Sequence, residues 1–185
     1  MRTLLTVLSA IVLLTYPFAV YFGIDKLGLE VVALLLGIVF LLRILSGHQA
    51  KLKEFKQLAV ISGVIGVMLV TLGAIFKQQG WLTFYPVIVN LAMLTLFASS
   101  LTQPQTIIER LARLQEPELP ESGVRYTRTV TKVWCWFFLI NASIALYTCF
   151  QSLQVWTLYN GLISYLAAGS LLAGEWIVRQ FVRKD

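Results

Sequence analysis

Long apolar stretches constrain this chain more than any other feature. A bilayer core of about 30 Å takes roughly 20 apolar residues per helix, and six stretches reach that length. Only 13% of the residues are charged, against about 25% in soluble domains. The sequence therefore predicts an all-α membrane protein, a six-transmembrane-helix bundle in which residues 1–185 form a single integral-membrane domain. The expected spans are residues 3–23, 27–47, 58–76, 81–101, 132–153 and 155–178.

The first stretch resembles a signal peptide because Arg2 precedes an apolar segment. Its apolar segment is longer than the usual 7–15 residues, and no A-x-A-like cleavage site follows it. We therefore expect this stretch to be a retained span.

Positive charges fall on alternate connections between the stretches. Thirteen of the 15 Lys and Arg residues lie before the first span, in or next to the second and fourth connections, or after the last span. Only Lys26 and Lys77 lie on the other side. The positive-inside rule then predicts a multi-pass protein of the bacterial inner (plasma) membrane with cytoplasmic N- and C-termini. The net charge of +6 reports this topology, and no nucleic-acid partner is expected.

The connection at residues 102–131 is the one long cytoplasmic loop, and it is expected to contain a short amphipathic helix. Thr106 and Glu109 have the spacing of a capping box, and Pro117 would end the helix soon after it begins. Glu109, Arg110 and Arg113 are expected on its polar face, with Glu109 and Arg113 paired at i,i+4. The apolar face is expected to consist of Ile107, Ile108, Leu111 and Leu114.

Polar side chains inside the predicted spans are candidates for function, because they are costly at membrane depth. Asn90 and Asn141 each lie about ten residues into adjacent antiparallel spans, which places both near the bilayer centre. We expect both to point into the bundle and to meet each other, or a shared partner such as Ser164 or Tyr165. They could serve as polar contacts between helices or as substrate contacts. The full set of intramembrane polar candidates is Glu30, Asn90, Asn141 and Asn160.

Other side chains have structural interpretations. Glu175 and Arg179 have the spacing of an interfacial ion pair. Two sets of small residues are expected to permit close helix packing, namely Ser62, Gly66 and Gly73, and Gly161, Gly169 and Ala173.

His48 is the only histidine, and the chain has no HExxH, P-loop or CxxC motif. No metal site, cofactor or catalytic residue is therefore expected.

The second half of the chain carries short motifs that are specific only in combination. They are Tyr85–Asn90, Ser100-Leu101, Ile108–Leu114, Gly123–Arg128, Trp134–Asn141, Leu158–Tyr165 and Gly174–Trp176. Together they resemble a family of uncharacterised bacterial inner-membrane proteins that are often encoded in aryl-polyene, or xanthomonadin-like, biosynthesis clusters. The resemblance covers about residues 81–180. It implies a setting in the synthesis or export of an acyl-carrier-bound polyene lipid, but no defined reaction.

Three functions remain open on these grounds. The first is a non-catalytic membrane component that assists assembly or export of a lipid-linked aryl-polyene-type product. Its partners would be membrane lipid, and an acidic acyl carrier protein or other pathway enzymes. The contact residues would be Arg110, Arg113, Arg125, Arg128 and Lys132, although the positive-inside rule alone also predicts basic residues there.

The second function is a small transporter or flippase subunit with a polar path at mid-depth, and a homodimer would be expected for it. The third is a membrane-embedded lipid-modifying enzyme that uses Glu109, Glu175 or His48 for acid/base chemistry. A mid-depth polar cavity would favour transport, and titratable groups clustered at the inner face would favour catalysis. A filled bundle with a basic inner surface would favour the assembly role.

Overall fold

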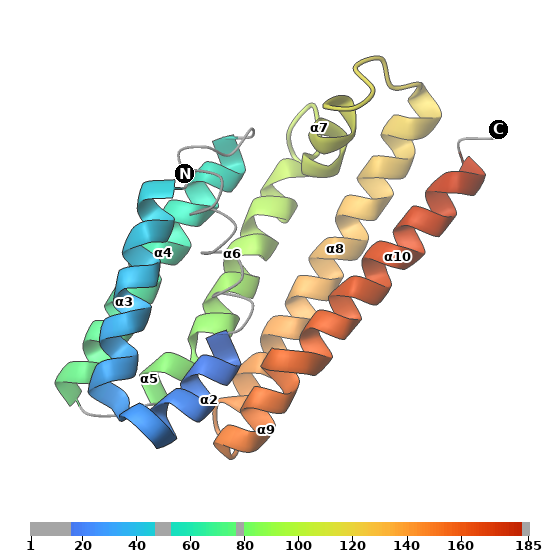
Figure 1. Cartoon of the computed structure of the whole chain (residues 1–185). Helices are drawn as coiled ribbons and strands as arrows, with labels where there is room; N and C mark the ends of the chain where they lie inside the picture. Colours follow the sequence, from blue (N-terminus) through green and yellow to red (C-terminus); the bar gives the residue numbers. More distant parts are fainter. Residues whose placement is uncertain (1–15, 47–52, 77–79, 183–185) are drawn as a thin grey trace.

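The computed structural model describes residues 16–46, 53–76 and 80–182, and this part of the chain is helical without strands (Figure 1). The all-α prediction is thereby confirmed for the described residues. The helices are α2 (Tyr16–Leu27), α3 (Leu29–Ser46), α4 (Lys53–Phe76), α5 (Gly80–Thr83), α6 (Tyr85–Ser100), α7 (Ile107–Arg113), α8 (Glu121–Thr148), α9 (Leu153–Leu158), the π-helix η2 (Tyr159–Ile163) and α10 (Ser164–Val182).

The long helices α3, α4, α6, α8 and α10 lie side by side (Figure 1). Helix α3 packs on α4, and α6 packs on both α4 and α8. One end of the bundle, here called the α7 end, holds α7, the first turns of α8 and the last turns of α10. The opposite end, the α9 end, holds α2, α5 and α9.

Three described segments are long and apolar enough to cross a membrane. They are Gly80–Ser100 with 21 residues, and Glu121–Thr148 and Leu153–Gln180 with 28 residues each. The second and third predicted spans correspond to α3 and α4, whose apolar parts are the shorter segments Leu29–Leu42 and Val60–Phe76. Most of the first predicted span lies outside the described residues. Length and hydropathy thus support three spans in the described part of the chain, and six are not supported.

Helix α8 has different bounds from the fifth predicted span. Helix α8 begins at Glu121 and ends at Thr148, whereas the sequence predicted residues 132–153. The reason is that a buried stripe with helical spacing already begins at Thr127, continues through Val130 and Trp134, and so includes polar residues that hydropathy scores poorly. Pro120, in an extended conformation, marks the start of the helix.

A proline near the start of α6 organises the core at the α9 end. Pro86 has no amide hydrogen, so it cannot donate to the carbonyl oxygen of Leu82 four residues earlier. The hydroxyl of Tyr16, which is 1% exposed, donates to that carbonyl oxygen at 2.7 Å. The indole Nε1 of Trp156 donates to the neighbouring carbonyl oxygen of Thr83 at 2.9 Å. Side chains from α2 and α9 therefore satisfy the backbone where α5 and α6 meet.

Small residues permit close packing at some of the predicted positions. A Cβ atom on Gly66 would lie 2.5 Å from the ring of Phe40, and one on Gly161 would lie 2.9 Å from the ring of Phe18. Both predictions of close approach are confirmed. The prediction for Gly169 is wrong, because a Cβ atom there would meet nothing within 4 Å, and Ala173 is exposed as well.

Candidate functional site

Helix α7 is the element that encloses the candidate site. The side chain of Thr106 accepts a hydrogen bond from the amide of Glu109 at 3.3 Å, which caps the helix as predicted. Ile107 is fully buried against Phe97, Val130, Trp134 and Phe138. The apolar contact of Ile107 therefore fixes α7 against α8 at the end of the bundle.

Leu114, which was expected on the apolar face, is 51% exposed and follows the last helical residue. One prediction about the faces of α7 is wrong. Glu109 was expected on the polar outer face, but it is 3% exposed. Its carboxylate accepts from Arg113 Nε at 2.9 Å, and Arg113 Nη1 donates to the carbonyl oxygen of Pro117 at 2.9 Å. This chain of bonds ties α7 to the loop that follows, so Glu109 can be buried as a paired charge.

A cleft of about 650 Å³ lies between α7, the loop after it, α8 and α10. Ligand sites usually measure about 300–1,000 Å³ and combine apolar walls with a few polar groups. Apolar side chains from all three helices form one part of the lining, and polar groups form another. The apolar part includes Ile108, Leu111, Leu114, Val130, Trp134 and Leu172, and the polar part includes Glu116, Ser122, Tyr126, Glu175 and Arg179.

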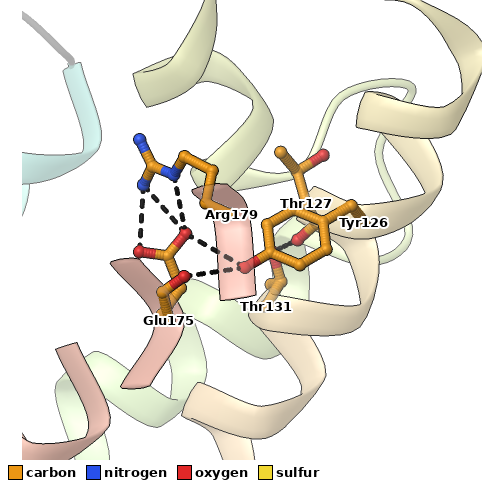
Figure 2. A network of polar contacts seen from close by, with 5 residues as sticks. All are labelled: Tyr126, Thr127, Thr131, Glu175 and Arg179. Atoms are coloured by element: carbon orange, nitrogen blue, oxygen red, sulfur yellow. Dashed lines mark hydrogen bonds and ion pairs between the residues drawn. The ribbon is translucent and has the colours of Figure 1, made fainter. Parts of the chain in front are cut away.

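The polar groups of α8 and α10 form a bonded network (Figure 2). Glu175 and Arg179 make the predicted i,i+4 ion pair, with Arg179 Nη2 2.8 Å from Glu175 Oε1 and 2.9 Å from Oε2. Arg179 Nε also donates to Oε1 at 3.0 Å. The hydroxyl of Tyr126 donates to the backbone carbonyl oxygen of Glu175 at 3.0 Å, and it lies 3.4 Å from Oε1. Tyr126 thus joins α8 to the ion pair on α10.

The neighbouring threonines of α8 do not take part in this network. Thr127 Oγ1 donates to the carbonyl oxygen of Val124 at 2.9 Å. Thr131 Oγ1 donates to the carbonyl oxygen of Thr127 at 2.8 Å (Figure 2). Both hydroxyls are therefore satisfied within their own helix.

The five predicted basic contact residues differ in their exposure and in their partners. Arg128 Nη2 donates to the carbonyl oxygen of Leu101 at 2.8 Å, so this residue caps the end of α6. Arg113 binds Glu109 and Pro117, and Arg110 is partly buried. Lys132 and Arg125 are exposed, and Arg125 is 3.8 Å from Glu121.

The two mid-bundle asparagines meet, as predicted. Asn141 Nδ2 donates to Asn90 Oδ1 at 2.9 Å and to Ser164 Oγ at 2.8 Å. The hydroxyl of Tyr159 donates to Asn141 Oδ1 at 2.7 Å. Asn90 Nδ2 donates to the carbonyl oxygen of Pro86 at 2.8 Å. The contact prediction is confirmed, and the amide groups are used between helices α6, α8 and α10 and the π-helix.

The remaining polar candidates lie apart from the asparagine pair. Asn160 is 4% exposed, and its Nδ2 donates to Thr148 Oγ1 at 3.0 Å and to the carbonyl oxygen of Trp156 at 2.9 Å. Glu30 is exposed and lines a separate cavity of about 360 Å³ that also touches Leu27 and Ala74. That cavity includes neither Asn90 nor Asn141.

No group of three or more His, Cys, Asp or Glu side chains in the described ranges could hold a metal ion. His48, one of the residues considered for acid/base chemistry, lies outside the described residues. Comparison of the chain with protein-family models, with curated proteins and with solved structures finds no match.

Sequence reasoning missed the cleft and most of its lining. Tyr126, Val130 and Trp134 have the i, i+4 and i+8 spacing of one helical face, which was a usable signal. The contribution of Leu172 had no such signal, because it depends on how α10 packs across α8.

Proposed function

We propose that this protein is a non-catalytic component of the bacterial inner membrane that holds an amphiphilic, lipid-linked molecule at the cytoplasmic end of its bundle. The observation that carries the proposal is the amphipathic cleft of about 650 Å³ at the α7 end. An apolar wall beside polar groups at the end of a membrane bundle suits a molecule with a chain and a polar head. The resemblance to membrane proteins of aryl-polyene clusters supports a role in assembly or export of such a product.

The proposal includes six membrane spans with both termini in the cytoplasm. The strongest support is the distribution of Lys and Arg, because the positive-inside rule predicts that the more basic α7 end faces the cytoplasm. Helices α3 and α4 pack on each other and keep apolar side chains exposed, including Leu34 at 66% and Val64 at 53%. Exposed apolar faces of that extent favour contact with lipid. Lys132 and Arg125 remain exposed and could meet an acidic carrier protein.

Transport is less well supported by the geometry. A transport path would need polar groups that face a cavity near the bilayer centre. Asn90 and Asn141 instead use their amide groups on each other, on Ser164 and on Tyr159.

Lipid modification is the second candidate, because titratable groups do cluster in the cleft. Tyr126, Glu175 and Arg179 all line it. However, both carboxylate oxygens of Glu175 already accept hydrogen bonds from Arg179. Glu109 is buried and paired with Arg113. We therefore favour binding over catalysis.

The binding proposal is tested by filling the cleft. Ala112 lies in the cleft lining, so Ala112→Phe places a ring where the ligand chain would lie. The purified full chain in dodecyl maltoside is exposed to a diazirine-bearing long-chain alcohol, and labelled peptides are identified by mass spectrometry. We expect wild type to be labelled on α7 and α8 at the cleft, and Ala112→Phe to lose at least half of that labelling.

The matched control is Ala173→Phe, since Ala173 is exposed on α10 outside the cleft lining. Its cleft labelling should equal that of wild type. Labelling spread evenly along the apolar helices, or an equal loss in both variants, would overturn the proposal.

A further inference from the structure

Glu175 and Arg179, in the polar part of the cleft, differ in how many of their hydrogen-bonding atoms are used. Glu175 is 11% exposed at its side chain, and both of its carboxylate oxygens accept bonds from Arg179. Arg179 donates through Nε and Nη2 alone, and Nη1 makes no hydrogen bond to any residue of the described ranges. A guanidinium has five N–H donors in a fixed planar fork. The unused Nη1 edge, on a side chain that is 37% exposed, therefore offers donors to a ligand in the cleft.

The group that fits these donors is an oxyanion. Planar guanidinium donors match carboxylate and phosphate oxygens in geometry, and such charge-assisted bonds are stronger than neutral ones. Glu175 already offsets the charge of Arg179. A singly charged head group is therefore favoured over a doubly charged one, because an extra negative charge would meet this carboxylate.

The apolar lining indicates what the head group is attached to. Leu111 of α7, Trp134 of α8 and Leu172 of α10 all line the same cleft as Arg179. Each methylene removed from water contributes about 0.8 kcal/mol, so a chain laid along these side chains gains more with each added carbon.

We propose that the cleft binds a long-chain amphiphile with a singly negative carboxylate or phosphodiester head, held by the Nη1 edge of Arg179 with its chain on the apolar wall. This inference rests on the proposed binding function and names the chemical class of the ligand. Glu175 occupies Nε and Nη2 of Arg179 and offsets part of its positive charge.

Two photoreactive probes with the same chain test the assignment. They are a diazirine-bearing hexadecanoic acid and the corresponding hexadecanol, applied to the full chain in dodecyl maltoside, a detergent without an anionic head. Wild type should label at the cleft about tenfold more strongly with the acid, the difference expected for one charge-assisted hydrogen bond. Arg179→Gln should reduce the acid-to-alcohol ratio to about 1, whereas Glu175→Gln should retain or raise it.

The two variants separate recognition from folding, because each removes one member of the same ion pair. If the pair matters only for stability, both variants would lower labelling by both probes, and the inference would be overturned. Lys26→Gln is the matched charge control, since Lys26 is exposed on α2 at the α9 end and outside the cleft lining. It should leave the ratio unchanged.

Competition then identifies the source of the head group. Unlabelled palmitate displacing the acid probe would indicate a free carboxylate, and phosphatidylglycerol displacing it would indicate a membrane phosphodiester. Displacement by neither competitor would contradict the inference. Equal labelling by acid and alcohol would refute the charged head alone, whereas absence of cleft labelling by both probes would refute the binding function itself.

Discussion

Asn141 is the side chain whose removal should most affect the middle of the bundle. It is 5% exposed and takes part in three side-chain hydrogen bonds, with Asn90 at 2.9 Å, Ser164 at 2.8 Å and Tyr159 at 2.7 Å. These partners lie on three other helical segments. Asn141→Ala therefore removes every one of these ties from α8 at once.

The expected cost follows from the number of bonds. Hydrogen bonds between membrane helices contribute about 0.6 kcal/mol each on average, so three contribute about 2 kcal/mol. Asn141→Leu keeps most of the side-chain volume and should cost a similar amount, because the lost bonds dominate over the cavity. Tyr159→Phe and Ser164→Ala, which each remove one bond, should each cost about 0.6 kcal/mol.

The free energy of unfolding can be measured by titrating dodecyl sulfate into dodecyl maltoside micelles and following tryptophan fluorescence. Ser143→Ala is the matched control, because Ser143 lies two residues from Asn141 and bonds only the Leu139 carbonyl oxygen of its own helix. It should change the free energy by less than about 0.5 kcal/mol. A double-mutant cycle on Asn90 and Asn141 should give a coupling of about 0.6 kcal/mol. Asn141→Ala within about 0.5 kcal/mol of wild type, or purely additive effects, would refute the reasoning.

Two further predictions concern the α9 end and the topology. Tyr16→Phe should lower the free energy of unfolding by about 1 kcal/mol, because the Leu82 carbonyl oxygen loses its donor. The loss should be smaller in a Pro86→Ala background, because residue 86 then regains an amide hydrogen. A loss of the same size in both backgrounds, measured by the same titration, would contradict this account. A reporter fused after Gln115 should be active in the cytoplasm and one fused after Gln154 in the periplasm, as the charge distribution requires; the reverse pattern would invert the proposed orientation.

The contact between Asn90 and Asn141 was predictable because the position of each asparagine within its own apolar stretch can be read from the sequence. Span length fixed the depth of Asn90 and of Asn141, and the cost of an unpaired amide in lipid required both to face protein. The Glu175–Arg179 pair was predictable for the same reason, since i,i+4 spacing alone brings the two side chains together.

Burial of Glu109 was not predictable from the pattern around it. Its neighbours Arg110 and Arg113 marked a polar face, and the i,i+4 pair with Arg113 was read as a surface contact. In the structure the Glu109 carboxylate is buried while it remains paired with Arg113. What decides between the two is where α8 begins. It starts at Glu121, eleven residues before the predicted span, in a segment whose hydropathy is lowered by Glu121, Arg125 and Arg128.

The position of the cleft follows from how the last helical segment, Leu153–Gln180, is held. Only 11% of its most apolar part is buried, and apolar helix faces gain little from each other when lipid is the alternative. Polar bonds join it to α8 at three heights, through Asn160 and Thr148, through Tyr159 and Asn141, and through Glu175 and Tyr126.

Apart from these bonds, α10 packs less extensively on α8 than α6 does. Leu171 of α10 packs against the apolar cluster of α6, α7 and α8, and near it the hydroxyl of Tyr126 bonds the backbone of Glu175. An anchoring bond at one point leaves apolar surface on α7, α8 and α10 without full contact on either side of it. The same residues that fix α10 therefore create the cleft, and they also place Arg179 in its lining. Tyr126 therefore bonds α8 to α10, and it also holds the Glu175–Arg179 pair beside the apolar wall at this end of the bundle.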